Sequence, residues 1–230
     1  MIKVLQNWQE IGDSILNLQR EGLPTHGTVQ KNWDHFLLYN ALISTDRQSM
    51  IVDLGFGEGW TLTFLHALGF NNIHGVDFRI DRRLRVKQLL TMWRQKTLRP
   101  PYHLQRANIT KTPFQPESYD IAISISTIEH GVDIDRFLAE AGRILKPNGL
   151  LFITTDYWDD KIRTDRSARA FGLSWQVFSR DQIETMVRVA SNLGLVLFHK
   201  TAIPKCSGRP VLWHNSSYTF IAMLFTKATA

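Results

Sequence analysis

Residues 51–60 read Ile-Val-Asp-Leu-Gly-Phe-Gly-Glu-Gly-Trp, and most of the predicted architecture rests on them. The apolar run at their start is too short for a helix and is typical of a buried parallel strand. Three alternate glycines, Gly55, Gly57 and Gly59, predict a tight turn after that strand. Residues 61–68 then show a helical pattern that Gly69 ends. The segment therefore predicts a strand, a glycine turn and a helix, where a phosphate or a nucleoside can bind.

Trp60 argues against a dinucleotide site. The G-x-G-x-x-G fingerprint needs a third glycine for close packing of helix on strand, and Trp60 stands at that place. The pattern is instead Asp-x-Gly-x-Gly-x-Gly, with Asp53 ending the strand and Glu58 opening the helix. A carboxylate beside the turn attracts a cationic ligand and repels a phosphate. A dehydrogenase is therefore disfavoured.

A second acid follows at the tip of the next predicted strand. Residues 73–78 read Ile-His-Gly-Val-Asp-Phe, and Asp77 lies 18 positions after Gly59. A carboxylate at about this distance from the glycines is placed to accept both hydrogen bonds of a ribose diol. The turn and this acid together predict a nucleoside ligand.

Four motifs in this order resemble class I S-adenosylmethionine (SAM) dependent methyltransferases, of the small-molecule or glycan type known as methyltransferase domain 11-like. They are the turn at 53–59, the strand ending at Asp77, the segment 105–126, and Leu145-Lys146-Pro147-Asn148-Gly149 before a fifth strand. The resemblance covers roughly residues 48–200. It implies that SAM is the cofactor and S-adenosyl-L-homocysteine the product.

The resemblance also implies which residues hold the cofactor. They are Asp53, Gly55, Phe56, Gly57, Glu58, Asp77, Phe78, Asn108, Ile109 and Ser126. In the family an acid usually holds the adenine amino group where this chain has Asn108, whose carbonyl can accept the same hydrogen bond. Ile109 would pack on the adenine ring.

Two candidates for proton transfer follow the fourth and fifth predicted strands. Residues 126–130 read Ser-Thr-Ile-Glu-His and resemble a segment that, in some methyltransferases, holds a divalent metal through Glu-x-x-Glu-His. Ser126 replaces the first acid, so we expect no metal. His130 titrates in the useful range and could accept a hydroxyl proton; the alternative is that Glu129 and His130 only fix the loop. Asp156 is the second candidate, as a base or as a ligand of a substrate hydroxyl.

The rest of the chain alternates between strand and helix patterns. Beyond the strands ending at Asp53 and Asp77, strands are expected at 102–106, 119–124, 150–154, 195–198 and 218–225, with helices at 133–145 and after a capping box at 179–182. The alternation predicts an α/β, doubly wound sheet with ligands at the carboxyl ends of its strands. The resemblance implies a seven-stranded Rossmann-like sheet whose last strand is antiparallel.

Residues 1–47 are predicted to form a helical cap on a methyltransferase domain at 48–230. Two amphipathic helices are expected from the apolar residues Val4, Trp8, Ile11, Ile15 and Leu18, and Val29, Trp33, Phe36 and Leu37. The first helix can pack on the domain or form a homodimer contact. Because such helices cap the cofactor pocket in similar methyltransferases, His26, Trp33 and His35 are candidates to line the site, with core packing as the alternative.

Composition and charge limit the class of protein. The chain has 230 residues, 43% of them apolar, and a single cysteine, Cys206, so an intrachain disulfide is excluded. Neither a signal peptide nor a membrane span is predicted, and a cytoplasmic protein is expected.

Residues 79–99 carry eight of the basic residues against Asp81 alone. This segment could attract nucleic acid, a sugar nucleotide or a phospholipid surface. The alternative, which we favour, is a solvated outer helix with an apolar stripe, Val86, Leu89, Leu90 and Trp93, that faces the sheet.

Two connections are long enough to be functional, at 156–178 and 201–216. Their tryptophans, arginines and carboxylates suit a sugar or another polyhydroxylated acceptor. The favoured function is therefore methyl transfer to a hydroxyl of a small molecule or of a glycan or natural-product intermediate. The alternatives are an RNA methyltransferase that uses the basic 79–99 segment, and a non-catalytic SAM-binding protein. The chain has neither G-x-S-x-G nor C-x-x-C, so a hydrolase of that type and a zinc site made by such a cysteine pair are not supported.

Overall fold

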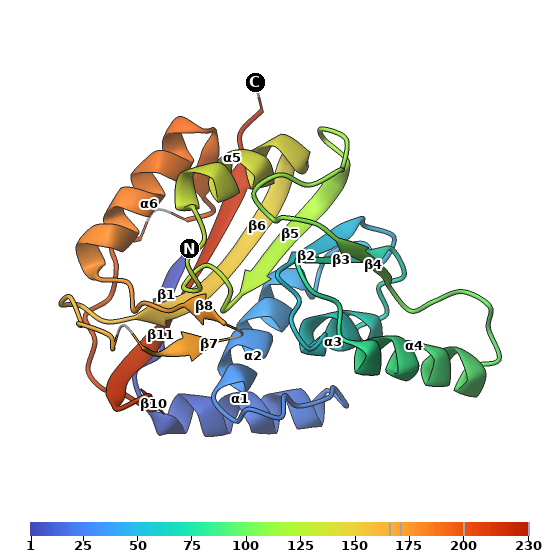
Figure 1. The fold of residues 1–230 in the computed structure, drawn as a ribbon, viewed down its shortest axis with the longest axis horizontal. Coiled ribbons are helices and arrows are strands. Elements are labelled where there is room, and N and C mark those ends of the chain that lie inside the picture. Colours follow the sequence, from blue (N-terminus) through green and yellow to red (C-terminus); the bar gives the residue numbers. More distant parts are fainter. Residues whose placement is uncertain (166, 171, 200, 230) are drawn as a thin grey trace.

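The computed structural model describes residues 1–165, 167–170, 172–199 and 201–229. One mixed sheet forms the centre, and helices cover both of its faces (Figure 1). Along the sheet the strands follow the order β1 (Ile2–Val4), β11 (Ser216–Lys227), β6 (Leu145–Tyr157), β5 (Tyr119–Ile125), β2 (Ile51–Leu54), β3 (Ile73–Asp77) and β4 (His103–Arg106). The expected α/β class is confirmed.

The pairing of the strands matches a doubly wound sheet. Strands β2 to β6 are mutually parallel, and β11 runs antiparallel to β6 from Thr219 opposite Tyr157 to Thr226 opposite Leu150. The predicted antiparallel last strand is therefore confirmed. Two short strands, β9 (Leu195–Leu197) and β10 (Val211–Trp213), also pair with β11. The chain order reverses between β2 and β5, which is where such sheets bind ligands.

Among the residues that the structure describes, five of the six helices divide between the two faces of the sheet. On one side α1 (Trp8–Arg20), α2 (Lys31–Leu42) and α3 (Trp60–Ala67) share an apolar core. On the other side α5 (Ile134–Ile144) and α6 (Arg180–Asn192) share a second core. Helix α4 (Arg82–Arg94) lies at the lower right of Figure 1, at the end of the molecule opposite α6. A small hairpin, β7 (Arg169–Ala170) and β8 (Leu173–Ser174), precedes α6.

Local sequence explains where the elements begin. All four residues of β2 are buried, as expected of a strand covered on both faces. The Asn7 side chain accepts a hydrogen bond from Glu10 N and begins α1, and Asp133 begins α5 in the same way. The predicted capping box from Ser179 to Gln182 is present at α6.

Three predictions about the elements were wrong. Val4 belongs to β1 rather than to the first helix, because Ile2 and Val4 are buried while Lys3 between them is exposed, a two-residue period that suits a strand. Residues 145–149, expected as a turn before the fifth strand, lie within β6 at an irregularity in its pairing with β5. The stripe of α4 does not face the sheet: of the residues in this helix only Leu84 is buried.

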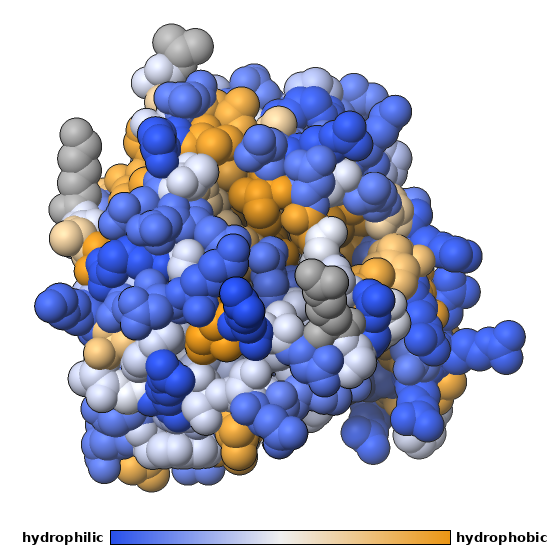
Figure 2. Space-filling view, turned by 60° about the vertical axis from the view of Figure 1, so that its left-hand side comes forward, coloured by the Kyte–Doolittle hydropathy of each residue, from blue (hydrophilic) through white to orange (hydrophobic). Residues whose placement is uncertain are grey.

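The surface is mixed in polarity. Hydrophilic residues cover most of the face in Figure 2, with hydrophobic residues between them in its upper half. Among the described residues, none of the helices combines the length and the apolar character needed to cross a bilayer.

We predict that Phe152→Ala lowers the free energy of unfolding by about 3–5 kcal/mol, because this fully buried ring fills the core at the centre of the sheet. Urea unfolding would measure the loss. Leu212→Ala is the control, since Leu212 is 71% exposed in β10 and its truncation should cost within about 0.5 kcal/mol. Equal losses in the two variants would contradict this packing.

Candidate functional site

The glycine turn between β2 and α3 has the shape of a ligand cradle. Gly55, Gly57 and Gly59 all have positive φ, at 93°, 50° and 76°. A Cβ at Gly55 would collide with the Thr127 side chain, and one at Gly59 would come within 2.6 Å of Leu84. By contrast, nothing lies within 4 Å of the Cβ position at Gly57. The chain therefore leaves room for a ligand at the middle glycine.

Asp77 ties this turn to the end of β3. Its Oδ2 accepts a hydrogen bond from Gly57 N at 3.0 Å, and its Oδ1 accepts one from Arg79 N at 3.0 Å. A carboxylate oxygen can accept two hydrogen bonds, so each oxygen keeps capacity for a further donor. The residue is thus fixed at the turn and can still bind a ligand hydroxyl.

Asp53 is a buried acid with an unused acceptor. Its side chain is 1% exposed, and its Oδ2 has no hydrogen-bond partner among the described residues. Burial, and then the charge of Asp77, raises the pKa of Asp53 well above its usual range. Buried polar atoms normally have partners, so a ligand that donates a hydrogen bond or carries positive charge fits this position.

The other predicted cofactor residues lie around the turn. Phe56 and Ile109 are buried, whereas Phe78 is 48% exposed. Ala107 N donates to Asp77 O at 3.0 Å, which places the segment before Asn108 against the end of β3. The Asn108 Oδ1 accepts hydrogen bonds from Thr110 N at 2.9 Å and from Thr110 Oγ1 at 3.0 Å, so its amide NH₂ is the group left for a ligand.

The cap touches the start of α3. The His26 ring lies 4.7 Å from the Trp60 ring, and a Cβ at Gly27 would lie 3.0 Å from the same indole. Trp60 Nε1 donates a hydrogen bond to Glu58 Oε2 at 3.2 Å, so the exposed Glu58 side chain is held beside the indole ring. The loop before α2 therefore lies over the residue that follows the glycines.

Of the other two cap residues considered as site candidates, neither reaches the turn. Trp33 is 3% exposed in the core, and its Nε1 donates to Glu10 Oε2 at 3.2 Å. His35 is buried and stacks on Phe64 with ring centroids 4.6 Å apart. Both residues pack in the core, which is the alternative that the sequence left open.

Three buried carboxyl groups lie near the carboxyl ends of β5 and β6. They belong to Asp34 of α2, Glu129 and Asp156, and we call them the acid cluster. Glu129 Oε2 accepts a hydrogen bond from Thr155 Oγ1 at 3.0 Å, and Asp156 Oδ2 accepts one from Trp175 Nε1 at 2.7 Å. Glu129 and Asp156, which were expected after the fourth and fifth predicted strands, are therefore close neighbours after β5 and at the end of β6.

Lys31 supplies positive charge to the acid cluster. Its Nζ lies 3.3 Å from Asp34 Oδ2, donates to Ser126 Oγ, and sits 3.4 Å from the centroid of the Phe220 ring. Ser126 has φ of +48°, which turns the chain directly after β5. The sequence pattern did not predict that Lys31 and Asp34 belong to this site, because a Lys-x-x-Asp pair in a helix is ordinarily an exposed surface pair.

Burial sets the protonation of the acid cluster. Desolvation raises the pKa of Asp34 to about 6 and that of Glu129 to about 7, with the charge of Lys31 opposing both shifts. Desolvation, followed by the charge of Glu129, raises the pKa of Asp156 to about 7. Burial lowers the pKa of His130, although Asp156 partly offsets it. At neutral pH the acids are therefore partly protonated and His130 is uncharged.

Both long connections reach the acid cluster. Gln176 N donates to Glu129 O at 3.1 Å, and Phe178 N donates to Asp156 O at 3.0 Å, so the first connection folds back over these acids. Trp213 of β10 meets Trp175 with ring centroids 4.5 Å apart. Trp175 of the first connection thus lies beside Asp156, and Trp213 of the second connection packs against Trp175. Arg166, in the first connection, falls outside the described residues.

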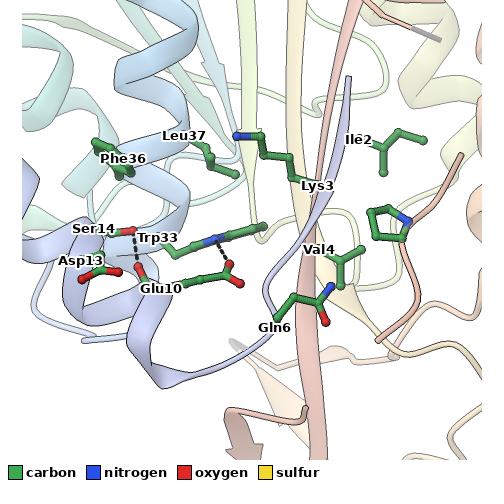
Figure 3. A pocket seen from close by; sticks show the side chains of 11 residues that line it. Ile2, Lys3, Val4, Gln6, Glu10, Asp13, Ser14, Trp33, Phe36 and Leu37 are labelled. Carbon is green, nitrogen blue, oxygen red and sulfur yellow. Dashed lines mark hydrogen bonds between the residues drawn. The ribbon is translucent and has the colours of Figure 1, made fainter. Parts of the chain in front are cut away.

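A pocket of about 400 Å³ lies elsewhere, between β1 and the cap helices (Figure 3). Trp33 and Glu10 form the hydrogen bond at its centre in that view, and Ser14 Oγ donates to Glu10 O at 2.6 Å. Neither the glycine turn nor the acid cluster contributes to its lining. In the described part of the chain, no three His, Cys, Asp or Glu side chains are arranged to hold a metal ion.

Comparison with known proteins identifies related chains. A family model described as a methyltransferase domain matches residues 52–153. A probable S-adenosylmethionine-dependent methyltransferase of Mycobacterium tuberculosis is 24% identical over 144 residues, which cover 62% of this chain and 49% of the relative. A ubiquinone biosynthesis O-methyltransferase of Mesorhizobium japonicum is 31% identical over 58 residues, which cover 25% and 20% of the two chains.

A solved SAM-dependent methyltransferase of Methanosarcina mazei superposes with a TM-score of 0.63 at 14% identity, covering 84% of this chain and 98% of that one. This likeness concerns the fold. The chain spans 55% and 49% of the length of the first curated relatives that it matches.

We predict that the free energy of unfolding falls as pH rises from about 4 to about 7. Unfolded carboxyl groups titrate near 4, whereas Glu129 and Asp156 titrate at about 7 in the folded chain. The folded chain therefore binds more protons over this range, and its stability is fully present below the unfolded pKa and is lost as pH rises through the folded pKa.

Asp156→Asn should flatten this decline by on the order of 1–3 kcal/mol, as measured by urea unfolding at a series of pH values. Asparagine can still accept the hydrogen bond from Trp175, so packing is preserved. Asp160→Asn, at an exposed position, is the control. An unchanged slope in Asp156→Asn would show that this acid titrates normally.

Proposed function

We propose that the chain is a class I SAM-dependent methyltransferase and that it transfers a methyl group from SAM to a hydroxyl of a small molecule or of a glycan or natural-product intermediate. The observation that carries the proposal is the hydrogen bond from Gly57 N to Asp77, beside open space at the middle glycine of the turn. This arrangement offers a carboxylate for a ribose and open space at the turn for the rest of the cofactor.

The residues present fit SAM. Asp77 would accept hydrogen bonds from the ribose hydroxyls, and the buried, unpartnered Oδ2 of Asp53 suits the cationic methionine end. Phe56, Gly55, Glu58 and Phe78 would surround the cofactor, and Ile109 would pack on adenine. Because its carbonyl already accepts two hydrogen bonds, Asn108 would recognise adenine through its amide NH₂ as a donor.

The acid cluster would serve the acceptor. When bound, SAM supplies the methyl group and a neutral thioether leaving group. Asp156 would accept the proton of the acceptor hydroxyl, because a base is most effective when its pKa lies near the working pH, and burial raises the pKa of Asp156 to about 7. Lys31 would stabilise negative charge on the acceptor oxygen. His130 is the second candidate for the base, although its lowered pKa makes it weaker.

The surroundings of Asp156 support a polyhydroxylated acceptor. Trp175 and Trp213 come from the two long connections and meet beside this acid. The half-buried Trp213 can stack on the apolar face of a sugar while carboxylates bind its hydroxyls, and the buried Trp175 holds Asp156 in place. The ubiquinone O-methyltransferase match, limited to 58 residues, also supports transfer to oxygen. Residues 1–47 would act as the cap, through the contact of His26 with Trp60.

We predict that Asp77→Ala weakens binding of S-adenosyl-L-homocysteine by about 1–3 kcal/mol, because it removes hydrogen bonds to the ribose. Calorimetric titration would measure the change. Asp81→Ala is the control, since Asp81 is exposed and begins α4 without touching the turn. Unchanged affinity in Asp77→Ala would place the cofactor elsewhere.

We also predict that Asp156→Asn lowers kcat by about 10²- to 10⁴-fold and abolishes the rise of kcat/KM with pH through about 7, because it removes the base. Transfer of a labelled methyl group to hydroxylated acceptors would be followed, together with affinity for S-adenosyl-L-homocysteine, which should be unchanged. His130→Ala should keep the pH profile. If His130→Ala abolishes the rise of kcat/KM with pH and Asp156→Asn keeps it, His130 is the base and Asp156 is not.

A further inference from the structure

Helix α4 presents an apolar stripe to solvent. Val86, Leu89, Leu90 and Trp93 are 56%, 63%, 49% and 77% exposed, and their spacing places them on one face of the helix. The opposite face attaches the helix to the domain: Leu84 is buried against Gly59, and Gln88 Nε2 donates to Tyr102 O. The stripe therefore lies on the outward side of a helix that is already anchored. Leu98, shortly after the helix, is 95% exposed.

Basic residues border this stripe on both sides. With 3.6 residues per turn, Arg83, Lys87 and Arg94 fall along one side of it and Arg85 along the other, and Lys96 follows the end of the helix. All eight basic residues from 79 to 99 are exposed, and none of them forms a salt bridge with any residue that the structure describes. Asp81 is the single acid in this segment, and its side chain accepts a hydrogen bond from Arg83 N at the start of α4. Lys87 Nζ lies 5.3 Å from the centroid of the Trp60 ring, and the other seven cations are available to a partner.

We infer that the outward face of α4 docks on the surface of an anionic lipid bilayer. Apolar side chains flanked by arginine and lysine suit such a surface, because the apolar groups enter the boundary of the acyl chains while the cations reach the headgroups. Tryptophan favours this same boundary. Charge alone would suit RNA equally well, but RNA offers no apolar layer for Val86, Leu89 and Leu90. This inference does not depend on the proposed methyl transfer.

The position of α4 permits this contact. The helix lies at one end of the molecule, beyond the sheet in Figure 1, so a flat surface can reach it without displacing the other helices. Only a few residues separate α4 from Asp77, and Leu84 packs against the glycine turn. A docked molecule would therefore hold its cofactor turn near the membrane surface.

Sedimentation of the full chain with vesicles tests this inference. Wild type should bind vesicles of phosphatidylcholine with about 30% phosphatidylglycerol, and binding should weaken as sodium chloride rises from about 0.05 M to about 0.5 M. It should bind vesicles of phosphatidylcholine alone at least about tenfold more weakly. The paired substitution Leu89→Ser and Trp93→Ser should lower binding to the anionic vesicles by about tenfold or more, because it removes the apolar part of the contact.

Control variants show whether any loss of vesicle binding is specific to the outward face of α4. Leu212→Ser changes a leucine that is 71% exposed on β10, and Arg188→Glu reverses an exposed charge on α6; both should bind as wild type does. Arg83→Glu with Arg94→Glu should weaken binding, and circular dichroism should show that each variant is folded. Equal binding to neutral vesicles, or equal binding by wild type and the α4 variants, would overturn the inference. Binding to RNA but not to anionic vesicles would also overturn it and would assign α4 to nucleic acid.

Discussion

The contacts of Lys31 join the cap to the sheet, and the chemistry proposed for the site depends on them. This side chain reaches from α2 to Ser126 after β5 and to the ring of Phe220 in β11, and it neutralises part of the charge around Asp34. Burying carboxyl groups is costly unless they are paired or protonated. With one lysine facing three acids, protonation is the remaining solution, and this explains why Glu129 and Asp156 titrate near neutral pH.

The two candidate sites lie on either side of the point where the strand order reverses. The glycine turn and Asp77 follow β2 and β3, while the acid cluster lies near the ends of β5 and β6. Thr127 connects them, since its Oγ1 donates to Gly55 O at 3.0 Å. A parallel sheet brings strand ends that are far apart in sequence to one edge. A cofactor on one side and an acceptor on the other would then meet at this junction.

Sequence predicted those features that depend on local pattern. The strands ending at Asp53 and Asp77 were found because buried runs and glycines are distinctive, and the helix after Asp133 because its stripe is regular. Features that depend on contacts between residues far apart in the sequence were predicted less well. The stripe of α4 has the period of a buried face but is exposed, and nothing local shows that Lys31 and Asp34 enter the core. Similarly, the sequence does not show that Thr110 donates two hydrogen bonds to the Asn108 carbonyl, which leaves only the amide NH₂ of Asn108 for a ligand.

The most direct test of the account is an infrared titration of the carboxyl groups with S-adenosyl-L-homocysteine bound, comparing wild type with Asp156→Asn. Protonated carboxyl groups absorb at a different infrared frequency from ionised carboxylates. The protonated fraction of the buried acids can therefore be measured at each pH. A component of the protonated-carboxyl band should disappear with a midpoint of about pH 7 in wild type, and this component should be diminished in Asp156→Asn. A wild-type spectrum in which every carboxyl group is already ionised at pH about 5 would contradict the account, since Asp156 would then titrate as an ordinary solvated acid.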